Sequence, residues 1–265
     1  MKIIWSTLLK SNFFRKALIT HLKAGYFHEL NHSISLGNGF WAHILENDAY
    51  DSFSEIFIKQ EYLDLLPNKK ISRIVDIGAH YGFFSLWLQA KFPETEICSL
   101  LVEPSPRACR ALEHLVQLKS LGGRFRFINK AIGNPKNKHS NFFDRPHMAG
   151  SIFASTLRSE DSIEVEQLCE AELLSEYPPP YDLIKCDIEG AEWDFIQNYD
   201  PVIRKTNYLL LEWHSWHSGG NGFPQLENKL KELDFEIIKK TNPESATGRE
   251  GQVGLLLAEN QQFQF

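Results

Sequence analysis

Short apolar runs alternate with longer segments of helical period from residue 72 onward. The strand-like runs cover residues 72–78, 96–103, 124–132, 181–187 and 207–214. Helical patterns lie between and after them, at residues 81–92, 105–119, 190–198 and 223–233. Such alternation is typical of an α/β protein, in which helices cover both faces of a mainly parallel sheet.

The last two strand-like runs follow a different rule. Residues 235–240 and 252–259 are separated by the turn-rich stretch 241–251, which leaves no room for a crossover helix. A pair of strands joined in this way is expected to be antiparallel. The sequence therefore predicts an open, mainly parallel sheet of seven strands with an antiparallel hairpin at its C-terminal edge.

Two segments depart from the alternation. Residues 1–50 predict an N-terminal extension of helix and strand before a main domain over residues 51–265. Within the extension, residues 3–22 have a helical period, which favours a helix packed on the main domain, with a helix on a membrane surface or a partner as the alternative. Residues 136–160 are polar with scattered aromatics and predict an insertion of loops and short strands that covers a site.

Composition excludes several classes of protein. Of the 265 residues, 43% are apolar and 23% are charged, which excludes a disordered chain. No run approaches the roughly 20 apolar residues of a transmembrane segment, and no signal peptide is indicated. The net charge of −6 argues against a nucleic-acid binder. Four cysteines without a Cys-x-x-Cys pair favour reduced thiols and a cytoplasmic location over a zinc ribbon or a disulfide framework.

Ligands of open α/β sheets bind beyond the carboxyl ends of the strands. At the end of the first strand-like run, Asp76-Ile-Gly-Ala-His-Tyr-Gly82 places two glycines four residues apart, which allows a sharp turn and close approach to a ligand. Glu103 follows at the end of the next run. A carboxylate there can accept both hydrogen bonds from a ribose diol. Together these residues predict a nucleoside-containing cofactor.

The glycine turn lacks the Gly-x-Gly-x-x-Gly spacing of dinucleotide-binding proteins, which argues against a nicotinamide oxidoreductase. Asp76 would also repel a pyrophosphate, whereas it would favour the cationic sulfonium of S-adenosylmethionine. His80 is placed to contact the carboxylate of such a cofactor. Tyr81, Phe83 and Trp193 are candidates for cation–π contacts, with core packing as the alternative.

Charged residues also end the last two parallel strands. Lys185 and Asp187 share one face of their strand, and Glu212 and His214 share a face of the next. For Glu189 and Glu192 the predictions are capping of the following helix and an ion pair to Lys185. Charged side chains are unfavourable in an apolar strand unless they have a function. Glu212, His214 and Asp187 are therefore the candidate catalytic residues.

Two kinds of chemistry suit these three residues. His214 is the candidate general base, oriented by Glu212 or Asp187, because an ordinary imidazole titrates near neutral pH. Asp187, Glu212 and His214 also form a set of oxygen and nitrogen ligands for a divalent cation, which would lower the pKa of an acceptor hydroxyl. His217 is an alternative base within the loop of residues 215–222.

Four blocks, in this order, resemble the FkbM-type family of S-adenosylmethionine-dependent methyltransferases. They are Val75-Asp-Ile-Gly-Ala-His-Tyr-Gly82, Val102-Glu-Pro-Ser-Pro106, Ile184-Lys-Cys-Asp-Ile-Glu-Gly-Ala-Glu192 and Leu211-Glu-Trp-His214. The third block is the most specific, whereas the glycine turn is common to class I methyltransferases. The resemblance covers about residues 50–260 and implies the Rossmann-like fold of that class.

The resemblance also implies roles for single residues. Gly78 and Gly82 would line the methionine part of S-adenosylmethionine, Glu103 would hold its ribose, and Lys130 would lie beside its adenine. Asp76, His80 and Asp187 complete the expected cofactor site. A solvated strand end is the alternative for Lys130.

The reaction that the resemblance implies is methylation of a hydroxyl on a sugar, lipid or natural-product acceptor. Methylation of nitrogen on a small molecule or peptide side chain is an alternative, and so is a cofactor-binding scaffold without catalysis. The sequence determines neither the acceptor nor the oligomeric state.

Overall fold

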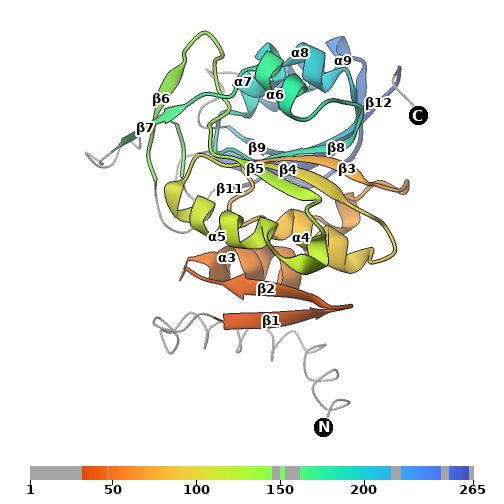
Figure 1. The fold of residues 1–265 in the computed structure, drawn as a ribbon. Helices are drawn as coiled ribbons and strands as arrows, with labels where there is room; N and C mark the ends of the chain where they lie inside the picture. Colours follow the sequence, from red (N-terminus) through yellow and green to blue (C-terminus); the bar gives the residue numbers. More distant parts are fainter. Residues whose placement is uncertain are drawn as a thin grey trace.

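The computed structural model describes residues 32–46, 48–144, 150–152, 162–215, 222–245 and 251–262. A central sheet separates two layers of helices (Figure 1). The predicted helix at residues 3–22 and the alternative base His217 lie outside the described residues. No helix within these ranges has the length and hydropathy needed to cross a membrane.

The central sheet contains the seven predicted strands. Its order is β10–β12–β9–β8–β3–β4–β5. The five parallel strands are β3 (Arg73–Ile77), β4 (Cys98–Val102), β5 (Phe125–Ile128), β8 (Tyr181–Cys186) and β9 (Thr206–His214). This arrangement confirms the predicted α/β fold with a mainly parallel sheet.

The C-terminal strands form an antiparallel pair, as predicted. β10 (Phe235–Lys240) pairs with β12 (Gln252–Asn260), and β12 pairs antiparallel with β9. Because β12 is inserted between β9 and β10, the edge strand β10 runs in the same direction as the parallel strands. The two-residue strand β11 (Glu244–Ser245), which was not predicted, adds an eighth member to the sheet within the described residues.

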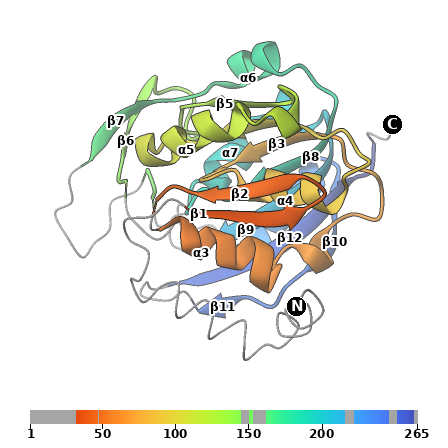
Figure 2. The same ribbon diagram turned by 60° about the horizontal axis from the view of Figure 1, so that its bottom comes forward.

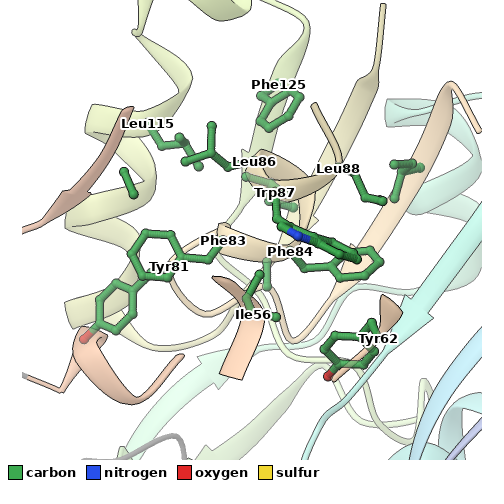
Figure 3. Packing of buried hydrophobic residues seen from close by; sticks show 14 of the residues in the cluster. Ile56, Tyr62, Tyr81, Phe83, Phe84, Leu86, Trp87, Leu88, Leu115 and Phe125 are labelled. Carbon is green, nitrogen blue, oxygen red and sulfur yellow. The ribbon is translucent and has the colours of Figure 1, made fainter. Parts of the chain in front are cut away.

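Helices α4 (Phe83–Lys91) and α5 (Pro106–Val116) cover one face of the sheet. Ser105 caps α5 by accepting a hydrogen bond from the amide of Ala108, and Pro106 occupies the first turn, where no amide donor is needed. Aromatic side chains of α4 and the preceding turn gather under the sheet, among them Tyr81, Phe83 and Trp87 (Figure 3). Core packing therefore accounts for Tyr81 and Phe83.

The opposite face carries α6 (Glu170–Glu176), α7 (Glu192–Asn198), α8 (Asp200–Ile203) and α9 (Phe223–Glu232). Successive residues of a strand pack alternately against the two helix layers. Ile74 packs with the α4 and α5 side, whereas Val75 packs with the side of α7 and α9. This alternation explains the continuous apolar runs, because a sheet covered on both faces buries every side chain.

The chain before the sheet forms β1 (His32–Gly37), β2 (Phe40–Ile44), α3 (Ala49–Phe53), the π-helical turn η1 (Ser54–Lys59) and the 3₁₀ turn η2 (Leu63–Leu65). β1 and β2 form a hairpin that crosses α4 (Figure 2). Phe40, Ala42 and Ile44 belong to the same apolar cluster as α4. The domain boundary near residue 50 stays a prediction.

A second hairpin stands at the side of the sheet. β6 (His139–Phe142) pairs antiparallel with β7 (Ile163–Glu166). The segment between them includes residues 150–152, and Ser151 forms a backbone bridge with Phe143. This hairpin begins within the predicted insertion at residues 136–160 and ends beyond it.

Gly82 shows why a glycine is needed at the start of α4. Its φ of +72° lies in the left-handed region, and a Cβ added there would come within 2.4 Å of Leu115 Cδ2. Gly123 provides a matched control, since its φ is +74° and nothing lies within 4 Å of its added Cβ.

We expect Gly123→Ala to lower the free energy of unfolding by about 1 kcal/mol, the cost of left-handed backbone in alanine. Gly82→Ala should lose about 1–3 kcal/mol more, because the methyl group overpacks the contact with α5. Urea denaturation of the two variants measures both values. Equal losses would contradict the packing explanation.

Candidate functional site

The strand order changes direction between β3 and β8. β4 and β5 extend the sheet on one side of β3, while β9 extends it beyond β8. A pocket of about 690 Å³ lies at the carboxyl ends of β3, β4 and β8, lined by Gly78, Glu103 and Asp187 among others. Ligands of α/β sheets bind at such a switch point.

The glycine turn after β3 presses against the end of β8. Gly78 has a φ of +71°, and an added Cβ would lie 1.7 Å from the carbonyl oxygen of Asp187, so no side chain fits. The amides of Gly78 and Ala79 both donate to the carbonyl of Val102 at the end of β4. The turn thus joins the three strands that form the pocket.

Glu103 is buried in this pocket, only 5% exposed. Its two carboxylate oxygens accept hydrogen bonds from the amides of His80 and Ser105, each at 2.8 Å. Burial raises the pKa of Glu103 to about 7, although these two amides and Lys185 act in the opposite direction. Since a carboxylate offers roughly four acceptor positions, Glu103 retains acceptor capacity for the hydroxyls of a ribose.

His80 also lines the pocket. Its Nδ1 is buried and has no hydrogen-bond partner among the described residues. Burial lowers the pKa of His80 to about 4, so the ring is neutral at pH 7. A neutral ring with an unused nitrogen suits a polar ligand, and together with Glu103 it makes the pocket compatible with S-adenosylmethionine.

Asp76 does not reach the pocket, contrary to the sequence-based argument that it would attract a sulfonium. It is fully buried, and its Oδ2 accepts from the hydroxyl of Ser85 at 2.8 Å. Its Oδ1 lies 3.8 Å from the ammonium of Lys185. Because Lys185 balances this charge inside the protein, Asp76 serves the sheet and is not among the pocket-lining residues.

Gly82 and Lys130, both predicted to contact the cofactor, lie differently with respect to the pocket. Gly82 packs against α5 and is not among the pocket-lining residues. Lys130 does line the pocket. Its ammonium is paired with Glu172 at 2.7 Å and Glu166 at 2.9 Å, so it joins α6 and β7 beside the pocket.

Asp187, Glu212 and His214 converge as predicted. One potential ligand atom from each lies within 4.8 Å of the others. Nε2 of His214 lies 3.9 Å from Oε1 of Glu212. Since Asp187 also lines the pocket, this cluster adjoins the pocket at the end of β8.

The surroundings of His214 argue against its predicted role as general base. The side chain is 2% exposed, and its Nδ1 lies 2.9 Å from Oε1 of Glu192, which is equally buried. Burial alone would lower the pKa of His214, but Glu192, Glu189 and Glu212 outweigh it and raise the pKa to about 10. An imidazolium has no lone pair for a proton, so His214 is a fixed cation at neutral pH.

Glu192 holds more than the histidine. Its Oε1 also accepts from the amides of Ile188 and Gly190, at 3.0 and 3.1 Å. Both amides precede α7, which has no side-chain capping bond at its N-cap Ala191, so the predicted helix-capping role is not observed for Glu192, and its ion pair goes to His214. Lys185 pairs instead with Asp187, at 3.3 Å.

Tyr62 is a site residue that the sequence analysis missed. Its buried hydroxyl donates to Oε2 of Glu212 at 3.0 Å. Burial and the neighbouring Asp187 raise the pKa of Glu212 to about 8, while Tyr62 opposes the rise. Tyr62 lies 150 residues from Glu212 in the chain, and no spacing or motif marks it.

Comparison with known proteins supports the same interpretation of the fold. Fibrillarin from Methanococcus jannaschii, a pre-rRNA processing protein, superposes with a TM-score of 0.52 at 10% identity, covering 89% of this chain and 85% of that chain. With the strand order and the switch-point pocket, this likeness shows a Rossmann-like α/β fold.

The family profile described as the methyltransferase FkbM domain matches residues 76–237. Methyltransferase 1 of Beauveria bassiana (strain ARSEF 2860) is 27% identical over 169 residues, which cover 55% of this chain and 65% of that protein. Methyltransferase sdnD of Sordaria araneosa is 24% identical over 227 residues, covering 72% and 84%. The match thus spans slightly less than two thirds of the Beauveria protein. The chain belongs to the FkbM family of methyltransferases.

We expect His214 to be protonated at pH 8. Its raised pKa means that the ion pair with Glu192 stabilises the fold fully below pH 6.5 and that this stabilisation disappears as the pH rises toward about 10. The ¹⁵N signals of the ring, assigned by comparison with His214→Gln, report the charge directly. Titration near pH 6.5 would restore His214 as a candidate base.

Proposed function

We propose that this protein transfers a methyl group from S-adenosylmethionine to a hydroxyl oxygen of a small-molecule acceptor, such as a sugar, lipid or natural product. The observation that carries the proposal is the pocket at the switch point, which extends between buried Glu103 and Asp187 and there adjoins Glu212 and His214. Membership of a methyltransferase family supplies the reaction class.

Within this proposal, the pocket residues divide the cofactor between them. Glu103 accepts the ribose hydroxyls, the backbone at Gly78 borders the methionine part, and His80 offers its buried Nδ1 to a polar group of the ligand. Lys130 borders the adenine end with its hydrocarbon stem, since its ammonium is already paired. The cofactor, when bound, supplies a methyl group on a positively charged sulfur.

The acceptor proton is proposed to pass to a carboxylate. Glu212 and Asp187 are the candidate acceptors at this end of the pocket. Glu212, which accepts a hydrogen bond from Tyr62, has a pKa of about 8 and must first ionise, which the positive charge of the cofactor would favour. His214, fixed by Glu192, contributes a positive charge that offsets the two carboxylates. Methyl transfer depends mainly on orientation and removal of this proton.

A divalent cation is the second candidate for the same cluster. Asp187, Glu212 and His214 offer oxygen and nitrogen donors, and Glu192 holds the other ring nitrogen, as is usual for a metal-ligating histidine. Such an ion would have to displace the proton on Nε2. It would supply a Lewis acid that lowers the pKa of an acceptor hydroxyl.

Methylation of nitrogen and a non-catalytic scaffold remain the alternatives. The net charge of −6 supports a small-molecule acceptor over a nucleic acid. All four cysteines are free thiols, which supports the proposed cytoplasmic location.

We expect the affinity for S-adenosylhomocysteine to rise about tenfold between pH 6 and pH 8. A pKa of about 7 means that the ionised fraction of Glu103 grows from about a tenth to about nine tenths over this range. Isothermal titration calorimetry measures the change. Glu103→Gln should abolish the pH dependence and Glu212→Gln should keep it; a flat wild-type profile would remove Glu103 from ribose binding.

We expect Glu212→Gln to lower turnover about 10²- to 10⁴-fold, because it removes a proton acceptor, while affinity for S-adenosylhomocysteine stays near normal. The assay follows methyl transfer from labelled cofactor to a pool of hydroxylated and amine acceptors. Glu259→Gln is the matched control, since Glu259 accepts from Tyr208 as Glu212 does from Tyr62.

Transfer by the wild-type protein to amines alone would favour the nitrogen alternative, and binding without transfer would favour a scaffold. Turnover that persists in Glu212→Gln would remove this residue from proton transfer. Chelation and dialysis before the same assay test the cation, because a metal-dependent enzyme would lose activity and regain it with added Mg²⁺ or Mn²⁺.

A further inference from the structure

We propose that Arg107 is a positioning residue for the cofactor pocket: it neutralises and orients Asp144 and thereby holds the chain after β6 at the pocket wall. Asp144 lines the pocket, whereas Arg107 is not among its lining residues. The inference rests on the proposed function, because it identifies the pocket as the cofactor site.

The contact between the two side chains is bidentate. The guanidinium of Arg107 donates to Oδ1 of Asp144 at 3.0 Å and to Oδ2 at 3.2 Å. The hydroxyl of Ser105 donates to Oδ1 at 2.9 Å. Two parallel bonds from a planar fork fix both the position and the plane of a carboxylate, so Asp144 is held against the first turn of α5.

Ser105 links this contact to Glu103. Its hydroxyl binds Asp144 while its amide donates to Oε1 of Glu103 at 2.8 Å. A shift of Asp144 would therefore be transmitted through Ser105 to Glu103, the carboxylate proposed to hold the ribose.

Charge connects the same groups. The charged and titratable groups that act on Glu103 include Lys185 from β8, Asp144 after β6 and the thiol of Cys109 on α5. Asp144 raises the pKa of Glu103, and Lys185 lowers it. Because Arg107 sits directly on Asp144, it offsets the repulsion between the two carboxylates.

Arg107 also joins a third segment to the pocket. Its guanidinium lies 3.5 Å from Oδ2 of Asp48, the residue before α3, and the other oxygen of Asp48 accepts a hydrogen bond from Tyr81. Tyr81 follows the pocket residue His80 in the glycine turn. One cation on α5 thus holds segments near residues 48 and 144, which are remote from each other in the chain.

The far end of the same pocket wall is held independently. The hydroxyl of Ser151 donates to the carbonyl oxygen of Glu189 at 2.9 Å. Phe142 and Ile152 of this wall line the pocket. Loss of Arg107 should therefore loosen one side of the wall without detaching it.

The test measures S-adenosylhomocysteine binding to the full chain by calorimetry and stopped-flow fluorescence. We expect Arg107→Ala to weaken binding about tenfold or more, mainly through faster dissociation, and to move the pH midpoint of binding upward, because Asp144 is left uncompensated beside Glu103. Arg107→Lys should retain part of the affinity, since it keeps the charge without the fork.

Arg110→Ala is the matched control. Arg110 lies one turn further along α5 and pairs with Glu46 at 2.9 Å, so it also joins α5 to the N-terminal segment, but it does not touch Asp144. It should bind S-adenosylhomocysteine as the wild type does. A loss equal to that of Arg107→Ala would show that any tie to the N-terminal segment suffices, and would overturn the proposal.

Asp144→Asn separates charge from folding. With residue 144 neutral, addition of Arg107→Ala should no longer move the pH midpoint, whereas a merely structural role for Arg107 would leave the midpoint unmoved by Arg107→Ala in either background. Wild-type affinity and midpoint in Arg107→Ala would also overturn the inference. A wild-type protein that binds no S-adenosylhomocysteine would instead reject the proposed function, which keeps the two failures distinct.

Discussion

The structure of the site depends on one buried ammonium. Lys185 is 4% exposed at the centre of the sheet. It donates to the carbonyl of Gly78 at 3.0 Å and to Asp187 at 3.3 Å, and it lies near Asp76, its register partner on β3. Burial alone would lower the pKa of Lys185, but Asp187 and Asp76 raise it. Removal of the ammonium or of its carboxylate partners would leave an uncompensated charge in the core, which is far more destabilising than the intact set.

Much of the architecture could be predicted because two physical rules act locally. Strands covered on both faces give continuous apolar runs, and polar residues at their carboxyl ends meet at one edge of the sheet. These rules located Glu103, Asp187, Glu212 and His214 without any knowledge of contacts, and the structure brings the last three together. Their catalytic roles stay predictions.

The rest could not be predicted because it depends on pairings between distant segments. No local sequence pattern indicates that β12 lies between β9 and β10, or that Tyr62 contacts Glu212. The interpretation of His214 changed for the same reason, since Glu192 on α7 raises its pKa more than Glu212 on its own strand does. The type of residue therefore predicted a functional site at the end of β9. The neighbouring side chains, however, determine whether the imidazole of His214 is protonated.

The buried ions also connect the two halves of the site. Lys185 contacts the carbonyl of Gly78, in the turn that borders the pocket, and the carboxylate of Asp187, in the cluster with Glu212 and His214. Glu103 and Glu212 both feel its charge, and each has a pKa raised by burial into the neutral range. A cationic ligand placed between them would favour ionisation of both carboxylates, because attraction to a positive charge stabilises the ionised form. Cofactor binding and proton acceptance are thus expected to be coupled electrostatically through the same small region, with no movement of the backbone required.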